Sequence, residues 1–198
     1  MAPATLLYPA PAFLVTCISK TGKLNIITIS WGGILCSKPP LLGISIQPSK
    51  YSYGLISETG EFVINIPTEE LIWATDYCGN VSGSEEDKFS VANLTPLPAA
   101  RVKPPVIKEC PVNLECKVVQ VLYLGSHDCF VGEVVAVQVN EEVLLSDIEG
   151  TGDPAFRETI DMEKCRPFVY LPGGGKYWNL KERIARVCYT KKPEAPEH

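Results

Sequence analysis

The stretch that decides the fold covers residues 25–52 and reads NIITISWGGILCSKPPLLGISIQPSKYS. It contains two short runs of apolar, largely β-branched residues, at 26–29 and 41–46, and residues that break regular structure follow each run. Such runs predict two β-strands. Gly32-Gly33 and Pro39-Pro40 lie between them. These pairs allow an unusual backbone path or a close approach to a ligand.

A helix is predicted directly after the second strand, over residues 50–58. Ser49 occupies the position of its N-cap, and Gly60 follows at its expected end. The free N–H groups and the dipole at a helix N-terminus favour an anion. Because Ser49 and Ser52 bring hydroxyl groups and Lys50 stands beside them, this turn is a candidate phosphate cradle.

Polar and aromatic side chains accompany the first strand. Asn25, Thr28 and Ser30 offer amide and hydroxyl groups, and Trp31 offers a flat apolar surface. Together with the cradle they suit a ligand that has a polar chain, a phosphate and a ring system. A tryptophan is just as often a buried core residue, and the glycines after Trp31 favour the ligand interpretation.

Composition limits the class of protein. The chain has 198 residues, of which 45% are hydrophobic and 21% charged, so we expect one globular domain over residues 1–198. Eighteen basic against 23 acidic side chains give a net charge of −5. This balance argues against nucleic acid as the main partner, because binding to a phosphate backbone requires clustered positive charge.

Two further functional classes find no support in the sequence. No apolar segment approaches the roughly 18 residues of a transmembrane helix, and the N-terminus lacks a basic leader, so a cytoplasmic protein without a membrane partner is expected. The eight cysteines form no Cys-x-x-Cys pair. We interpret them as mostly small buried thiols, with no metal site.

The rest of the chain predicts mostly strands. They are expected at residues 12–19, 24–30, 61–66, 112–124, 128–139 and 168–171. A helix capped by Thr68 is expected through Cys78, a long loop over 143–166, and a frayed tail over 191–198. Many short strands with few helices indicate a mainly β barrel with peripheral helices.

An ordered set of motifs extends over about two-thirds of the chain. The set comprises Asn25…Thr28…Ser30-Trp31-Gly32-Gly33, Lys38-Pro39-Pro40, residues 49–53, residues 60–67, Asp87-Lys88-Phe89, and His127 followed by Phe130-Val131-Gly132-Glu133-Val134. In this order the motifs resemble the flavin reductase-like family of FMN-binding split barrels, and most closely its flavoredoxin branch. No single motif is specific alone.

The resemblance implies a Greek-key-like split β-barrel and a homodimer with one non-covalent FMN per subunit. The residues that it implies for the ribityl chain and ring edge are Asn25, Thr28, Ser30 and Trp31. Those that it implies for the phosphate are Tyr51, Ser52 and Lys88, and Phe168 is implied as a contact from the C-terminal part. His127 is implied on the nicotinamide side. No side chain is expected to be catalytic, because the flavin carries the chemistry.

Simpler interpretations of these residues stay open. Ser49 and Ser52 can be plain capping residues, Lys88 can belong to an exposed helix start, and His127 can be an exposed residue of a hairpin tip.

Three functions remain at this point. The chain can be an NAD(P)H:flavin oxidoreductase, a flavoredoxin-like carrier that exchanges electrons with a redox protein, or a small-ligand-binding barrel without redox activity. The sequence has no Gly-x-Gly-x-x-Gly after a strand, so NAD(P)H would have to lie in an open cleft over the flavin.

Overall fold

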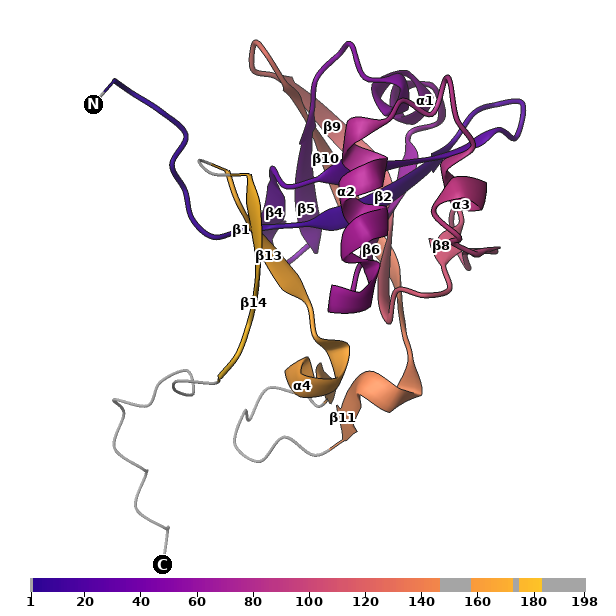
Figure 1. Cartoon of the computed structure of the whole chain (residues 1–198). Coiled ribbons are helices and arrows are strands. Elements are labelled where there is room, and N and C mark those ends of the chain that lie inside the picture. Colours follow the sequence, from indigo (N-terminus) through magenta and orange to yellow (C-terminus); the bar gives the residue numbers. More distant parts are fainter. Residues whose placement is uncertain (1, 147–157, 173–174, 183–198) are drawn as a thin grey trace, which may run out of the picture.

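The centre of the fold is a seven-stranded antiparallel sheet in the order β3-β2-β6-β9-β10-β5-β4 (Figure 1). The computed structural model describes residues 2–146, 158–172 and 175–182. The strands of this sheet are β2 (Phe13–Ile18), β3 (Leu24–Ile29), β4 (Gly32–Cys36), β5 (Leu41–Ile46), β6 (Glu61–Ile66), β9 (Val112–Tyr123) and β10 (Asp128–Val139). The predicted strands are confirmed, and β4 was missed because its two glycines were interpreted as a break.

The sheet curls so that β3 approaches β5. The backbone N–H of Ser45 in β5 donates to the carbonyl of Trp31 at 2.8 Å, which continues the pairing of β4 with β5. Only Ser30 and Trp31 link β3 to β4, so the two end strands of the sheet lie close together in the manner of a barrel. The mainly β fold class is therefore as predicted.

Alternate side chains of these strands fill the barrel. Phe62 of β6 and Phe130 of β10 are the largest of the fully buried side chains. A Cβ added to Gly132 would lie 2.6 Å from the Phe62 ring. Glycine at position 132 therefore leaves the space that the Phe62 ring occupies. The remaining buried members of this core are Val15, Cys17, Ile27, Ile29, Ile44, Ile46, Leu55, Ile56, Ile64 and Cys116.

Helix α1 (Tyr51–Thr59) follows β5 and ends at Gly60, whose φ of +68° is the left-handed conformation expected of a C-terminal glycine. The predicted cap is wrong: Lys50, not Ser49, occupies the N-cap position, and it makes no side-chain capping bond. The reason is that the turn of backbone before the helix runs one residue further than predicted, with Lys50 N–H donating to the Gln47 carbonyl.

Helix α2 (Ile72–Asn80), preceded by the short 3-10 helix η1 (Glu69–Leu71), packs on the outer face of β3 (Figure 1). The predicted helix was capped by Thr68 and ended at Cys78. The observed helix α2 begins later, at Ile72, and ends two residues further on, at Asn80. A Cβ on Gly79 would lie 3.2 Å from Thr28, so this glycine lets α2 approach the strand closely. Helix α3 (Lys88–Val91) follows the next loop.

The proline-rich stretch after α3 is held on the sheet by a buried carboxylate. It contains only β7 (Pro96–Leu97) and β8 (Val106–Ile107), as its irregular sequence predicts. Glu115 of β9 is fully buried and accepts hydrogen bonds from the backbone N–H groups of Ala100 and Arg101, at 2.8 and 2.6 Å. These bonds satisfy a charge that burial would otherwise destabilise.

The prediction of an unstructured loop over residues 143–166 is wrong in its described parts. These contain η2 (Glu141–Val143), β11 (Leu144–Ser146), β12 (Glu158–Ile160) and α4 (Met162–Cys165), and β11 pairs with β12. The elements were missed because each is too short to show a period. Residues 147–157 of the predicted loop and the predicted tail at 191–198 lie outside the described residues.

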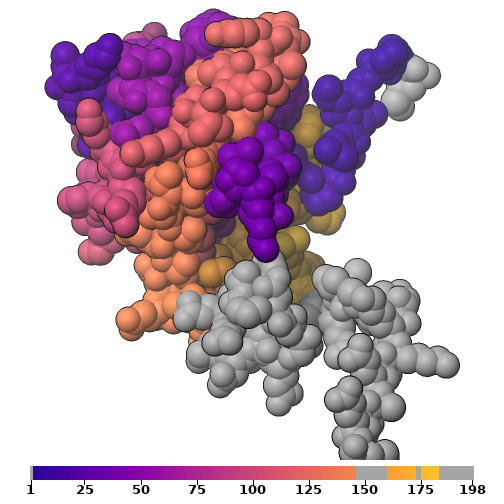
Figure 2. Space-filling model, turned by 180° about the vertical axis from the view of Figure 1, so that it is seen from behind, coloured from indigo at the N-terminus to yellow at the C-terminus, as the bar shows by residue number. Residues whose placement is uncertain are grey.

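The C-terminal strands form a second, three-stranded sheet. β13 (Phe168–Leu171) pairs with β14 (Lys176–Asn179) and with β1 (Ala10–Pro11) near the N-terminus. Residues 2–9 precede β1 as an arm that stands clear of the body in both views (Figures 1 and 2). Among the described residues, no helix is long and apolar enough to span a membrane.

Candidate functional site

A polar groove follows β3 on the side that faces α1 and α2. It consists of three adjoining hollows, which we call the lysine hollow, the tryptophan hollow and the tyrosine hollow, with volumes of about 230, 230 and 330 Å³. The lysine and tryptophan hollows share Ile27, Lys50 and Gly79, and the tryptophan and tyrosine hollows share Thr28, Ser30 and Gly79. The shared residues make one groove long enough for an extended ligand.

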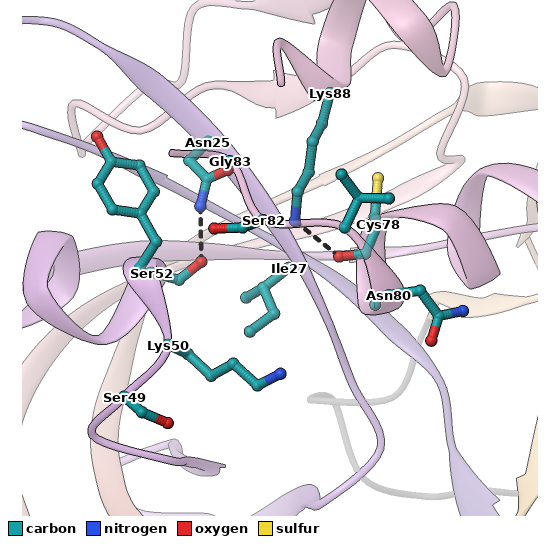
Figure 3. Close-up of a pocket in the computed structure, with 13 residues that line it drawn as sticks. Asn25, Ile27, Ser49, Lys50, Ser52, Cys78, Asn80, Ser82, Gly83 and Lys88 are labelled. Carbon is teal, nitrogen blue, oxygen red and sulfur yellow. Dashed lines mark hydrogen bonds between the residues drawn. The ribbon is translucent and has the colours of Figure 1, made fainter. Parts of the chain in front are cut away.

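The lysine hollow has an amide and a hydroxyl fixed in its wall (Figure 3). The side-chain N–H of Asn25 donates to the Ser52 hydroxyl at 2.7 Å, and both residues are buried. Ser52 belongs to the first turn of α1, so this bond holds the helix N-terminus against β3. The hydroxyl hydrogen of Ser52 is left to donate to a ligand.

Lys88 supplies a buried positive charge to the same hollow. Only 4% of the residue is exposed, and its ammonium donates to the carbonyls of Ile26 and Cys78, at 2.7 and 2.8 Å. Figure 3 shows the second of these bonds. Burial lowers the pKa of this ammonium. Lys88 makes no salt bridge to the described carboxylates, and its third N–H is not used by the two carbonyls.

A cation buried without a carboxylate partner attracts an anion to the hollow. Lys50 adds a second positive charge, because it reaches from the start of α1 into the same space (Figure 3). Lys50 is an exposed residue. Its position in two hollows nevertheless allows its ammonium to meet a ligand.

The loop between α2 and α3 closes the hollow at Gly83. A Cβ at this position would lie only 1.7 Å from Oδ1 of Asn25, so no larger residue fits without moving the loop or the amide. That Oδ1 is buried without a hydrogen-bond partner in the described part of the chain. No local sequence pattern indicates this contact.

Trp31 lines the tryptophan hollow together with a residue from a distant hairpin. Its ring lies 4.4 Å from that of His127, centroid to centroid, at an interplanar angle of 37°. Because 40% of Trp31 is exposed, it is not a core residue. The two rings offer an accessible apolar surface next to the hydroxyl groups of Thr28 and Ser30.

The Thr28 hydroxyl is already engaged by the fold. It donates to the Thr75 carbonyl of α2, at 2.5 Å, so toward a ligand it can only accept. The tryptophan hollow also includes Ser45 and Gln47 at the end of β5, which sequence reasoning missed. Their proximity follows from the curling of the sheet, which no local pattern shows.

The tyrosine hollow lies under the β13–β14 hairpin. The Tyr177 hydroxyl donates to Oδ1 of Asp76 at 3.2 Å, and the Asn80 amide donates to Oδ2 of the same carboxylate at 3.0 Å. Burial, and then the neighbouring Asp76 charge, raise the pKa of Tyr177 to about 12, so its phenol is protonated at neutral pH. Tyr170 stands beside it, with ring centroids 5.6 Å apart.

The predicted site residues fall into three groups. Asn25, Tyr51, Ser52 and Lys88 line the lysine hollow, and Thr28, Ser30, Trp31 and His127 line the tryptophan hollow. Phe168 lines none of the three hollows. It is buried, edge-on to Tyr177 at 5.5 Å, and so it supports a lining residue instead of forming the surface itself.

Several solved structures share the fold of this chain. The flavoredoxin of Desulfovibrio vulgaris (Miyazaki F) is 32% identical, with a TM-score of 0.85 over 97% of this chain and 98% of that one. The flavoredoxin of Methanosarcina acetivorans is 30% identical, with a TM-score of 0.82 over 96% and 95%. An FMN-binding protein of Thermus thermophilus, with bound 1-cyclohex-2-enone, is 25% identical, with a TM-score of 0.73 over 94% and 96%.

A family model gives the same assignment from the sequence side. The model described as "Flavin reductase like domain" matches residues 5–153, which include the strands and helices that line the lysine and tryptophan hollows. With its split barrel fold, the chain belongs to the flavin reductase-like domain family.

Proposed function

We propose that the chain binds one FMN non-covalently in the groove along β3 and acts as an FMN-dependent redox protein. The observation that carries this proposal is the buried Lys88 ammonium, which has no carboxylate partner among the described residues, in a groove that also presents the Trp31 and His127 rings. Asn25 and Trp31 are six positions apart along β3 and the two residues that follow it, a span of about 20 Å at the usual strand rise per residue. An elongated ligand with an anionic end and a flat end suits this arrangement.

The phosphate of FMN would lie in the lysine hollow. Lys88 would meet it with its remaining N–H, and the Ser52 hydroxyl and the backbone N–H groups at the start of α1 would donate to it. Tyr51 and Lys50 line the same space. Asn25 holds Ser52 in place, so it would act through that hydroxyl as well as through its own free acceptor.

The ribityl chain and the ring would continue into the tryptophan hollow. Ser30 can donate or accept there, Thr28 can accept, and the Trp31 ring can lie against the ring edge. When bound, the flavin supplies the hydride or electron transfer. The protein binds the cofactor, orients it and sets its electrostatic surroundings, and no side chain is needed as an acid or base.

Two redox roles remain, and each has one observation in its favour. The tryptophan hollow is open next to Trp31 and His127, which favours access by a small donor such as NAD(P)H and hence an oxidoreductase. The similarity to two flavoredoxins favours a carrier that exchanges electrons with another redox protein. A third role, a ligand-binding barrel without redox activity, would use Lys88 to bind another anionic ligand, and the test below separates it from the two redox roles.

We also propose that the functional unit is a homodimer. β4 lies at the end of the large sheet, and its Ile34 and Leu35 are 82% and 54% exposed, directly after Trp31. An exposed edge strand with large apolar side chains is the kind of surface that a second copy covers. A cytoplasmic location stays a prediction from the sequence.

The visible spectrum of the purified chain, before and after addition of FMN, tests the proposed function. We expect a bound flavin at about one FMN per chain. Anaerobic titration with NADH then separates the roles: bleaching by NADH supports the oxidoreductase, and bleaching only by a chemical reductant supports the carrier. A colourless chain that takes up no added FMN would contradict both roles.

A further inference from the structure

The tyrosine hollow differs in charge from the rest of the groove. Among the described residues that line it, Asp76 is the only charged one, and the others are small, polar or phenolic. The lysine hollow, which shares Gly79 and Asn80 with the tyrosine hollow, is lined by Lys50 and Lys88 and by no carboxylate in the described part of the chain. The groove therefore has one cationic hollow and one anionic hollow.

The polar atoms of the tyrosine hollow are arranged for a neutral, hydrogen-bonding ligand. Both oxygens of Asp76 accept a hydrogen bond from the protein, from Tyr177 and Asn80, which fixes the carboxylate in place. Each oxygen keeps further acceptor capacity for a ligand hydroxyl. The Tyr170 and Tyr177 rings supply flat apolar surface on which a planar ring can stack.

We propose that the tyrosine hollow binds the adenosine part of the electron donor and selects NADH over NADPH. The adenine would stack on the tyrosines, and the ribose hydroxyl groups would donate to Asp76, as carboxylates commonly bind a ribose 2′-hydroxyl. NADPH carries a phosphate at that hydroxyl, and the Asp76 charge repels it. Because Thr28 and Ser30 are shared with the tryptophan hollow, one donor can extend from the tyrosine hollow to the Trp31 surface. This inference rests on the proposed FMN-dependent function.

Equilibrium binding of the oxidised nucleotides tests the selection without any turnover. NAD⁺ and NADP⁺ are titrated calorimetrically into the full chain loaded with FMN, at low ionic strength. We expect NAD⁺ to bind roughly tenfold more tightly than NADP⁺. This is the size of effect expected when the doubly charged 2′-phosphate of NADP⁺ lies a few ångström from one carboxylate in a solvated site. The preference is expected to shrink as salt is added.

Two variants and one control locate the effect. Asp76→Asn keeps the hydrogen bonds to a hydroxyl but removes the charge, so it is expected to raise NADP⁺ affinity several-fold and change NAD⁺ affinity little. Tyr170→Ala is expected to weaken both nucleotides by a similar factor. Glu58→Gln removes one carboxylate that lines none of the three hollows, and it is expected to leave the ratio unchanged.

The outcomes separate this inference from the function on which it rests. Equal affinities for NAD⁺ and NADP⁺, an unchanged ratio in Asp76→Asn, or binding of neither nucleotide by a chain that holds FMN would overturn the inference alone. A chain that takes up no FMN would overturn the proposed function and this inference with it.

Discussion

Asn25 donates to the hydroxyl of Ser52 across 27 residues of chain, at 2.7 Å, and this bond joins the strand and the helix that form the lysine hollow. Both side chains are buried. The bond leaves Oδ1 of Asn25 unpaired in the described residues, next to Gly83. The position of the Asn25 amide therefore depends on Gly83, because any side chain at position 83 would occupy the space of Oδ1.

Replacement of Gly83 by alanine tests this dependence. The new Cβ would lie 1.7 Å from Asn25 Oδ1, so the loop or the amide must move and the bond to Ser52 is disturbed. We expect FMN affinity to fall by at least about tenfold, measured by fluorescence titration of the apo form. Gly54→Ala is the matched control: it meets open space on α1 and is expected to keep FMN affinity and gain roughly 0.5–1 kcal/mol of stability. Unchanged FMN binding in Gly83→Ala would show that the groove tolerates a shift of this loop.

Lys88→Met tests the phosphate assignment. The variant keeps an apolar stem but removes the ammonium, so it is expected to weaken FMN far more than riboflavin, which has the same ring and no phosphate. It also leaves the Ile26 and Cys78 carbonyls without their donor, at a cost of about 1–3 kcal/mol each in stability. Lys20→Met removes an exposed lysine outside the groove and should change neither ligand. An equal loss of FMN and riboflavin affinity would mean that Lys88 has only a structural role.

The pH dependence of FMN affinity follows from the same lysine. Burial lowers the pKa of Lys88 below the usual 10.5, so its ammonium loses its proton earlier than an exposed lysine does as pH rises. Only the charged form attracts the phosphate, whose second ionisation near pH 6 is complete by then. The ratio of FMN to riboflavin affinity is therefore expected to decline with rising pH, with a midpoint below 10.5. A ratio that stays constant across this range would contradict the assignment.

The same shift has a consequence for the stability of the apo form. Because the folded pKa of Lys88 is below the unfolded one, the unfolded state binds more protons between the two values. Stability from this group therefore rises with pH through that interval and is lower below it. At neutral pH folding therefore disfavours the charged form of Lys88 relative to its neutral form, while its hydrogen bonds to the Ile26 and Cys78 carbonyls contribute to stability.

A charged substitution on β4 tests the proposed dimer. Ile34→Glu places a carboxylate at an 82% exposed position of the edge strand. It should leave the fold of the subunit intact and convert a dimer into a monomer in sedimentation. Met162→Glu, on α4 at 50% exposure, is the control that should not change sedimentation. If wild type and both variants sediment alike, β4 is not the dimer surface.

The sequence allowed much of the fold to be predicted because its signals are local. The β-branched runs of β2, β3, β5 and β6 and the glycine at the end of α1 each follow from neighbouring residues. Strand β4 was missed because its two glycines interrupt the alternation of apolar and polar residues. The β11–β12 pair was missed because strands of three residues are too short to show that alternation. Ser49 was assigned to the cap because its residue type fits, but the backbone places Lys50 there.

The site was predictable only in part, because some of its contacts join residues that are distant in the sequence. Asn25, Ser52 and Lys88 come together as the motifs indicated, whereas the contacts of Gly83 and Asp76 depend on how a loop and a hairpin return to the sheet. Phe168 was chosen from the right strand. Tyr170, two residues further along β13 and therefore on the same face of the strand, lines the tyrosine hollow, whereas Phe168 is buried against Tyr177.

Trp31→Ala separates a binding role from a packing role. Because 40% of Trp31 is exposed and its main aromatic contact is His127, the apo protein should lose little stability in thermal melts. FMN affinity should fall, because the flat surface of the tryptophan hollow is removed. Phe62→Ala is the matched control: this ring is fully buried, and its loss is expected to cost about 3–5 kcal/mol. If Trp31→Ala destabilises the apo form as much as Phe62→Ala does, Trp31 is a packing residue and the ring end of the proposed site is wrong.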